Sequence, residues 1–123
     1  MKLRFLIFTL VSALIAGCHA NQPIPTNPES FVGSYVYVSI DTSVDKATDH
    51  QLDHLVLQSD GKYDLVEGGS TKARSEKTGV WHLVHGDRPN VELDHAGYPI
   101  QMNRHKIRLV VNDDLGEWYQ KVQ

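Results

Sequence analysis

The sequence of 123 residues contains a single cysteine, Cys18. One cysteine excludes a disulfide within the chain and a zinc site built from several thiolates. A small domain without such cross-links must draw its stability from its hydrophobic core. A closed β-structure suits a chain of this size, because it leaves no sheet edge unpaired.

Positive charge is also scarce. Twelve lysines and arginines stand against 15 aspartates and glutamates, for a formal net charge of -3. Lys2 and Arg4 lie in an N-terminal stretch that we expect to be removed, which would leave a charge of about -5. We therefore expect no nucleic-acid partner, because domains that bind nucleic acid carry a basic patch.

The sequence also has none of the common short catalytic motifs. It contains no Gly-x-Ser-x-Gly, no phosphate-binding loop and no His-Glu-x-x-His. We therefore expect a protein that is not an enzyme and has no resident cofactor.

The longest apolar run, residues 5–16, is shorter than the roughly 20 residues that a membrane-spanning helix requires. It follows Lys2 and Arg4 and leads into Leu-Ile-Ala-Gly-Cys at residues 14–18, where two small residues precede the cysteine. This arrangement is typical of a bacterial lipoprotein signal peptide. We predict cleavage before Cys18 and lipidation of its thiol.

The residue after Cys18 is His19, whereas an aspartate at that position typically retains a lipoprotein in the inner membrane of enteric-type bacteria. For a Gram-negative host we therefore expect a lipid anchor in the outer membrane, at its periplasmic face. Two or three acyl chains, at about 0.8 kcal/mol per buried methylene, would make this anchor durable. The expected regions are a signal peptide (1–17), a lipidated cysteine with a flexible, proline-containing tether (18–30) and a folded domain (31–123).

From residue 31 onward, apolar and polar side chains alternate with a period of two, which is typical of β-strands. Turn-forming residues separate the short runs. We predict eight strands, at residues 31–40, 54–59, 62–67, 77–85, 90–94, 98–102, 106–112 and 117–122. The pattern predicts an all-β fold, an antiparallel meander that forms either a sandwich or an up-and-down barrel. Eight strands suffice to close a small barrel, and we expect one of the lipocalin-like kind.

Two connections have features of their own. Asp60-Gly61 predicts a type I′ hairpin, in which both central residues have positive φ. The long connection at residues 41–53 has room for a short helix. A long helix is not expected there, because the aspartates that recur at every fourth position would align like charges on one face.

Several short motifs occur in an order that is known from one group of proteins. They are Gly33-Ser34-Tyr35, Leu-x-Leu-x-x-Asp-Gly-x-Tyr-x-Leu at residues 55–65, Gly79-Val80-Trp81, Val91-Glu92-Leu93, Tyr98-Pro99-Ile100 and Ile107-Arg108-Leu109. Over residues 31–121 the chain resembles the small lipocalin-like lipoproteins of bacteria, in particular the amino-terminal domain of the NlpE-type lipoproteins. The resemblance implies a lipocalin-like barrel. Those domains carry a Cys-x-x-Cys between their first two strands that this chain lacks, so copper or thiol chemistry is not expected.

Asp49, His50, Asp53 and His54 are the densest group of metal-binding side-chain types. Histidines four positions apart lie on one face of either a helix or a strand. Imidazoles with nearby carboxylates suit zinc, nickel or copper(II). One hypothesis is therefore a metal site at these four residues, and the alternative is a polar, solvated loop that leads into a strand.

Tyr35 and Tyr37 lie on the face of their strand opposite the aliphatic Val36 and Val38. If the aliphatic face fills the barrel, the tyrosines form an exposed strip for a protein partner. If the aromatic face points inward, they line a pocket for a small apolar ligand. In a third interpretation, they are part of an aromatic cluster that covers one end of the barrel. Trp81, expected to pack the barrel floor or core, belongs to the same candidate partner or ligand surface.

These patterns together predict a non-catalytic, lipid-anchored lipoprotein of the bacterial envelope that faces the periplasm and binds a protein partner. One version is an inhibitor or immunity protein against a toxin or hydrolase, since an acidic protein suits a basic enzyme surface. Two alternatives stay open. They are a lipocalin-like carrier or sensor of a small ligand, and a metal-binding lipoprotein of envelope stress.

Overall fold

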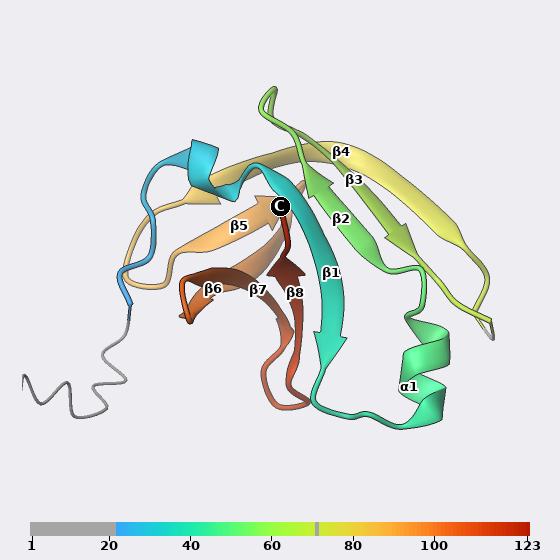
Figure 1. Cartoon of the computed structure of the whole chain (residues 1–123). Helices are drawn as coiled ribbons and strands as arrows, with labels where there is room; N and C mark the ends of the chain where they lie inside the picture. Colours follow the sequence, from blue (N-terminus) through green and yellow to red (C-terminus); the bar gives the residue numbers. More distant parts are fainter. Residues whose placement is uncertain (1–21, 71) are drawn as a thin grey trace, which may run out of the picture.

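The computed structural model describes residues 22–70 and 72–123 (Figure 1). Its elements are a 3-10 helix (Pro28–Phe31), β1 (Gly33–Ser39), α1 (Val44–Asp49), β2 (His54–Leu57), β3 (Lys62–Glu67), β4 (Ser75–Val84), β5 (Asn90–Leu93), β6 (Ala96–Asn103), β7 (Lys106–Asn112) and β8 (Glu117–Lys121). The predicted strands and the short helix are therefore confirmed. The signal peptide and Cys18 lie outside the described residues.

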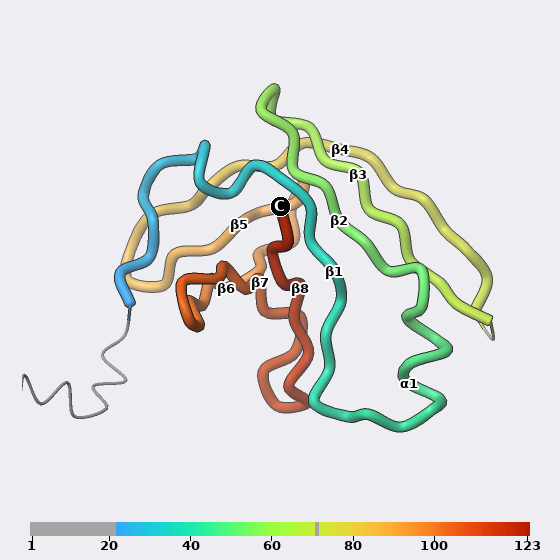
Figure 2. The backbone as a smooth tube through the Cα atoms, viewed as in Figure 1, coloured from blue at the N-terminus to red at the C-terminus, as the bar shows by residue number. Residues whose placement is uncertain are grey.

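The eight strands form one closed antiparallel barrel with up-and-down topology, which confirms the predicted fold class. Each strand pairs with its predecessor, and β1 closes the barrel by pairing with β8, where Tyr37 lies opposite Tyr119. The backbone trace in Figure 2 shows β1 beside β8, with the C-terminus at the upper end of β8. Closure leaves neither β1 nor β8 as a free edge.

This topology places alternate connections at opposite ends of the barrel. We call one end the helix end. It contains the β1–β2 connection with α1, together with the β3–β4, β5–β6 and β7–β8 connections. We call the other the tether end. It contains residues 22–32 and the β2–β3, β4–β5 and β6–β7 connections (Figure 1).

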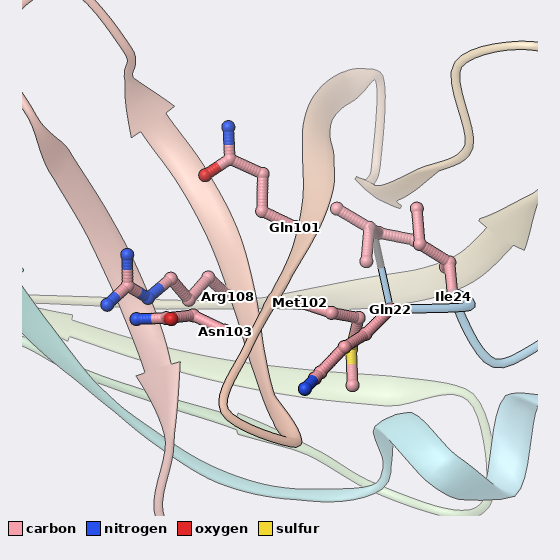
Figure 3. A pocket seen from close by; sticks show the side chains of 7 residues that line it. Gln22, Ile24, Gln101, Met102, Asn103 and Arg108 are labelled. Carbon is pink, nitrogen blue, oxygen red and sulfur yellow. The ribbon is translucent and has the colours of Figure 1, made fainter. Parts of the chain in front are cut away.

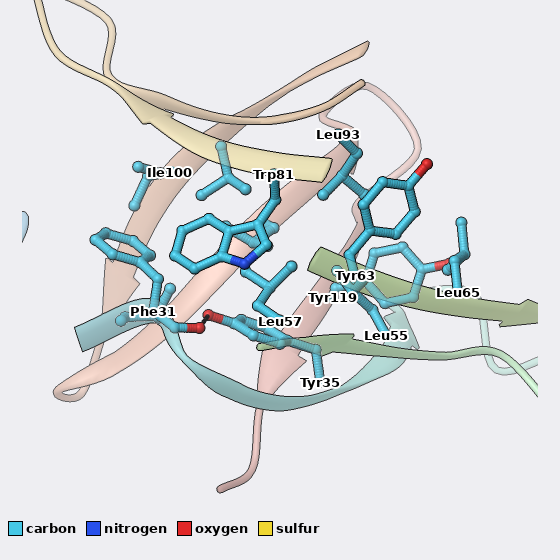
Figure 4. Packing of buried hydrophobic residues seen from close by; sticks show 13 residues of the cluster. Phe31, Tyr35, Leu55, Leu57, Tyr63, Leu65, Trp81, Leu93, Ile100 and Tyr119 are labelled. Atoms are coloured by element: carbon cyan, nitrogen blue, oxygen red, sulfur yellow. Dashed lines mark hydrogen bonds between the residues drawn. The ribbon is translucent and has the colours of Figure 1, made fainter. Parts of the chain in front are cut away.

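The barrel interior is filled by large side chains, many of them aromatic (Figure 4). Tyr35 is fully buried, whereas its neighbour Val36 is 38% exposed, so β1 turns its aromatic face inward. An eight-stranded barrel is just wide enough for side chains to fill it, and rings fill that volume better than valines do. The Tyr35 hydroxyl is satisfied by donating to the Phe31 carbonyl oxygen at 2.6 Å.

The β2–β3 turn differs from the predicted type I′ hairpin. Gly61 has φ of +84°, but Asp60 is not among the residues with positive φ. The Gly61 N–H donates to the Gln58 carbonyl at 3.1 Å, and Gln58 N–H donates to Lys62 O at 2.9 Å. These bonds define a longer loop that ends on a left-handed glycine, a common alternative to the two-residue turn.

Two of the motifs that support the resemblance interlock in the structure. Trp81 of the Gly-x-Trp motif donates from Nε1 to the Gln58 carbonyl at 2.8 Å, and its backbone N–H donates to the Gly61 carbonyl at 2.8 Å. Gly79 leaves space for the Asp94 carboxylate, which accepts from the Tyr63 hydroxyl at 2.7 Å. These contacts give both motifs a structural role in joining β2, β3, β4 and the β5–β6 turn.

The predicted flexible tether is packed against the barrel from residue 22 onward. Gln22 Oε1 accepts from the His105 N–H at 2.7 Å, Ile24 packs against the core, and Phe31 is fully buried. The prolines of this segment indicated an extended tether, whereas Ile24 and the adjacent Phe31 pack against the barrel. Residues 18–21 of the predicted tether lie outside the described residues.

Candidate functional site

Helix α1 is held to the barrel by polar contacts. None of its six residues is buried. Lys46 forms an ion pair with Glu117 at the start of β8, and the Thr48 carbonyl accepts from the Ser70 N–H at 3.0 Å.

Among the described residues, no helix is long and apolar enough to cross a lipid bilayer.

Asp53 connects the end of the helical connection to the β3–β4 connection. Its side chain is only 2% exposed. One carboxylate oxygen lies 2.6 Å from His50 Nδ1, and the other accepts from the Gly68 N–H at 2.7 Å. The His50 ring also stacks on Tyr37, with ring centroids 4.0 Å apart. A buried carboxylate with these partners is a structural anchor for α1.

The Lys46–Glu117 ion pair affects the titration of the groups beneath α1. The hydrogen bond from Lys46 holds the pKa of Glu117 below its ordinary value. Burial raises the pKa of Tyr37, and the neighbouring Glu117 carboxylate adds to the rise. No described residue makes a well-formed hydrogen bond with the buried Tyr37 hydroxyl.

A cavity of about 350 Å³ lies between β1 and α1, and Tyr37, Lys46 and His50 are among the residues that line it.

The structure does not gather the four residues of the metal hypothesis into a metal site. Asp53 points inward and is already bound by His50 and a backbone N–H, whereas His54 is exposed. Strand alternation produces this difference, because consecutive residues at the start of β2 face opposite sides. Within the part of the chain that is described, no group of three or more His, Cys, Asp or Glu side chains is placed to hold a metal ion.

The three aromatic residues of the candidate partner surface occupy different places. Tyr35 and Trp81 are buried in the core, so they do not form the exposed strip that one interpretation predicted. Tyr37 is half-buried beneath α1. Tyr35 and Trp81 face the other rings of the interior and fill the space that the ligand-pocket interpretation assigned to a small molecule (Figure 4).

An exposed apolar and acidic surface lies at the helix end. Ile40, Val44 and Leu115 are 69%, 76% and 54% exposed. The Ile40 N–H donates to the Gly116 carbonyl at 3.0 Å, which places the β1–β2 connection beside the β7–β8 turn. Exposed aspartates flank these apolar side chains. We call this set the helix-end surface, and its members are Ile40, Asp41, Val44, Asp45, Asp113, Asp114 and Leu115.

The acidic connection at residues 41–53 was recognisable from sequence as a candidate contact surface for a protein partner, but its union with the β7–β8 turn was not. Asp41 and Asp113 are 72 positions apart, and only barrel closure brings their connections together. A local sequence pattern could have indicated that the two connections share a surface. Both connections place an exposed aliphatic residue beside an aspartate, at Ile40-Asp41 and at Asp114-Leu115.

Two cavities lie at the tether end. One, of about 500 Å³, is lined by Gln22, Ile24, Met102 and Arg108, among others (Figure 3). The second, of about 530 Å³, shares Met102. It combines the apolar side chains of Met102, Ile107 and Val122 with the basic or titratable side chains of His105, Lys106 and Lys121.

The chain matches no protein-family model, and no curated protein or solved structure shows significant similarity to it. The structure supports the architectural part of the resemblance, which is a closed antiparallel barrel of eight strands.

Proposed function

We propose that this protein is a non-catalytic, lipid-anchored binding module of the bacterial envelope. It faces the periplasm and binds a protein partner through the helix-end surface. The observation that carries this proposal is the combination of exposed aliphatic side chains with four exposed aspartates at one end of the barrel. Such a combination resembles the apolar centre and polar rim of a protein–protein interface.

The charge of the helix-end surface indicates the chemistry of the partner. Asp41, Asp45, Asp113 and Asp114 are exposed around Ile40 and Leu115. A partner with a basic rim around an apolar depression would be complementary in both respects. Opposite charges would accelerate encounter and exclude acidic competitors, while the aliphatic side chains would contribute burial. An inhibitor or immunity protein against a basic toxin or hydrolase is the most specific version.

The polar groups beneath α1 support a binding role over a chemical one. Glu117 is engaged by Lys46, and Asp53 is engaged by His50 and Gly68. These contacts hold the β1–β2 connection on the barrel and thereby position Ile40 and Val44.

Site-specific photo-crosslinking in bacteria tests the proposal. A photoreactive residue at Ile40 or Leu115 in the full-length chain should capture the same protein from the envelope. Val80 is a matched control, since it is 55% exposed but lies on β4 outside the helix-end surface. Capture should fall at least tenfold when Asp113 and Asp114 are both changed to lysine. Equal capture at Val80, or capture that is insensitive to charge reversal, would contradict the proposal.

The lipid anchor is tested separately. A fatty-acid probe should label the full-length chain, and Cys18→Ala should abolish labelling and leave an uncleaved precursor. Labelling of the Cys18→Ala variant would refute the proposed lipidation site.

A further inference from the structure

We propose that the tether end docks on the anionic phospholipid surface of the membrane, through a basic patch beside the attachment point. The patch consists of Arg104, His105, Lys106 and Lys121, and we call it the tether-end patch. The proposal rests on the lipid anchor at Cys18 for its orientation. It adds a second contact with the bilayer and thereby determines which way the barrel faces.

The length of the chain beyond the described residues constrains this orientation. Gln22 is held at the β6–β7 turn by its hydrogen bond with the His105 N–H. Cys18 is four positions earlier, and four residues span at most about 14 Å when fully extended. A lipid on Cys18 therefore keeps the β6–β7 turn close to the phospholipid headgroups.

The cations at the two ends of the barrel differ in their partners. At the helix end, Lys46, Lys72 and Arg74 form ion pairs with Glu117, Glu67 and Glu76. The exposed Lys77 of β4 is an exception there, since it forms no ion pair with a described residue. At the tether end, Arg104 and Lys106 are exposed, and neither forms an ion pair with any residue in the described ranges. Unpaired cations are free to meet an external anion without first breaking an internal contact.

Lys121 extends the patch from β8. Its ammonium group donates to the Ser30 carbonyl at 2.9 Å, a neutral partner that leaves the positive charge uncompensated. Lys121, Lys106 and His105 line the cavity of about 530 Å³, together with the apolar Met102 and Val122. A surface that combines cationic and apolar side chains suits the boundary between charged headgroups and acyl chains of a bilayer.

The bilayer is favoured as the occupant for two reasons. The anchor would deliver this end of the barrel to the membrane, and the patch has the charge that an anionic leaflet attracts. Each lysine or arginine close to such a surface increases binding about fivefold, and the effect declines within a Debye length of roughly 8 Å. The acidic helix end would be repelled by the same leaflet, so the helix-end surface would point away from the membrane toward its partner.

Vesicle sedimentation tests the patch without the lipid anchor. Residues 22–123 contain the entire barrel and its core, so a chain that begins at Gln22 has all the parts needed to fold. In low salt it should sediment with phosphatidylglycerol vesicles and not with phosphatidylcholine vesicles, and about 0.3 M salt should release it. The double variant Arg104→Glu/Lys106→Glu should bind phosphatidylglycerol at least tenfold more weakly. The matched control Lys72→Glu/Lys77→Glu makes the same charge change outside the patch and should leave at least half of the binding.

Circular dichroism confirms that each variant is folded before it is compared. Binding to both vesicle types alike would overturn the proposal, as would equal losses in the two double variants. Competition by soluble glycerol phosphate at millimolar concentration would identify a single-headgroup site in place of a docking surface, and would also overturn the proposal.

Fluorescence quenching tests the orientation of the anchored protein. Full-length lipidated chains carrying a fluorophore at Asn103→Cys or at Thr42→Cys are placed in phosphatidylglycerol vesicles that contain a headgroup-labelled quencher. The label at residue 103 should be quenched several-fold more than the label at residue 42, and the Arg104→Glu/Lys106→Glu change should remove the difference. Equal quenching at both positions would contradict the orientation.

The outcomes separate this proposal from the lipid anchor. If the chain from Gln22 fails to bind phosphatidylglycerol vesicles while a fatty-acid probe labels Cys18, the docking proposal is refuted and the lipid-anchor proposal is supported. If the chain binds the vesicles but Cys18 is not labelled, the docking proposal is supported and the lipid-anchor proposal is refuted.

Discussion

At the tether end, the connecting segments are held by apolar burial. Phe31 is fully buried, and Ile24 packs against the core. At the helix end, α1 buries none of its residues and depends on the Lys46–Glu117 and His50–Asp53 contacts. Apolar burial is insensitive to pH and charge screening, whereas ionic contacts are not. The difference indicates a tether end that resists changes in conditions and a helix end that responds to them.

The largest effect should come from removing the apolar contact at the tether end. Phe31→Ala should lower the free energy of unfolding by about 3–5 kcal/mol, because it empties a fully buried site. Ile40→Ala, at an exposed position of the helix end, should change it by less than about 0.5 kcal/mol. Urea unfolding measures both. Similar values for the two variants would remove the distinction between the ends.

Removing the Asp53 carboxylate tests whether polar contacts hold α1 to the barrel at the helix end. Asp53→Ala should cost about 2 kcal/mol in urea unfolding, because the Gly68 N–H and His50 lose a buried charged acceptor. Hydrogen exchange should accelerate in α1 more than in β6 and β7. His50→Ala should reproduce part of the loss, while the exposed His54→Ala should be neutral. Uniform acceleration across the barrel would show that α1 is not a separate, weakly held unit.

The β2–β3 turn tests the tether end through backbone conformation. Gly61→Val should cost about 1–2 kcal/mol, because a β-branched side chain resists the φ of +84°. A Cβ at this position would meet only the Trp81 carbonyl, in ordinary contact, so the cost comes from the dihedral angle. Gly61→Asn should recover most of the loss in melting temperature. If the two variants melt alike, strain is not the cause.

The smallest effect concerns pH at the helix end. Hydrogen bonding by Lys46 lowers the pKa of Glu117 from its ordinary value of 4.5. A carboxyl group with a lowered folded-state pKa stabilises the fold above its unfolded pKa, and that stability is lost as pH falls through the folded pKa. The stability difference between the native chain and Lys46→Met should therefore be present near neutral pH and shrink below about pH 4.5. Lys72→Met, which breaks the exposed pair with Glu67, is the control and should show less pH dependence.

The local parts of the fold were predictable from sequence. Period-two alternation placed all eight strands, and the spaced aspartates limited the helix to a short one. The Asp60-Gly61 pair located a turn correctly but not its type, because Asp-Gly also suits a longer loop that ends on a left-handed glycine. These predictions succeeded where neighbouring residues determine the outcome.

The candidate sites were less predictable. The proximity of His50 and Asp53 in sequence suggested metal ligands, but the Gly68 N–H that binds Asp53 comes from the other side of the β2–β3 hairpin. The tether-end patch joins Arg104 and Lys106 of one turn with Lys121 of the last strand. No local pattern connects such residues, because their distances depend on barrel closure.

The sequence by itself determined the number and order of the strands and located each to within about two residues, since alternation and turn residues act over a few positions. That the strands close into a barrel was decided by the tertiary structure, in which β1 pairs with β8. Only the tertiary structure decided which face of β1 is inside. Both faces are apolar, so alternation could not choose between Tyr35 and Val36. The volume enclosed by eight strands made the choice, because rings fill it and the smaller aliphatic side chains are left outside.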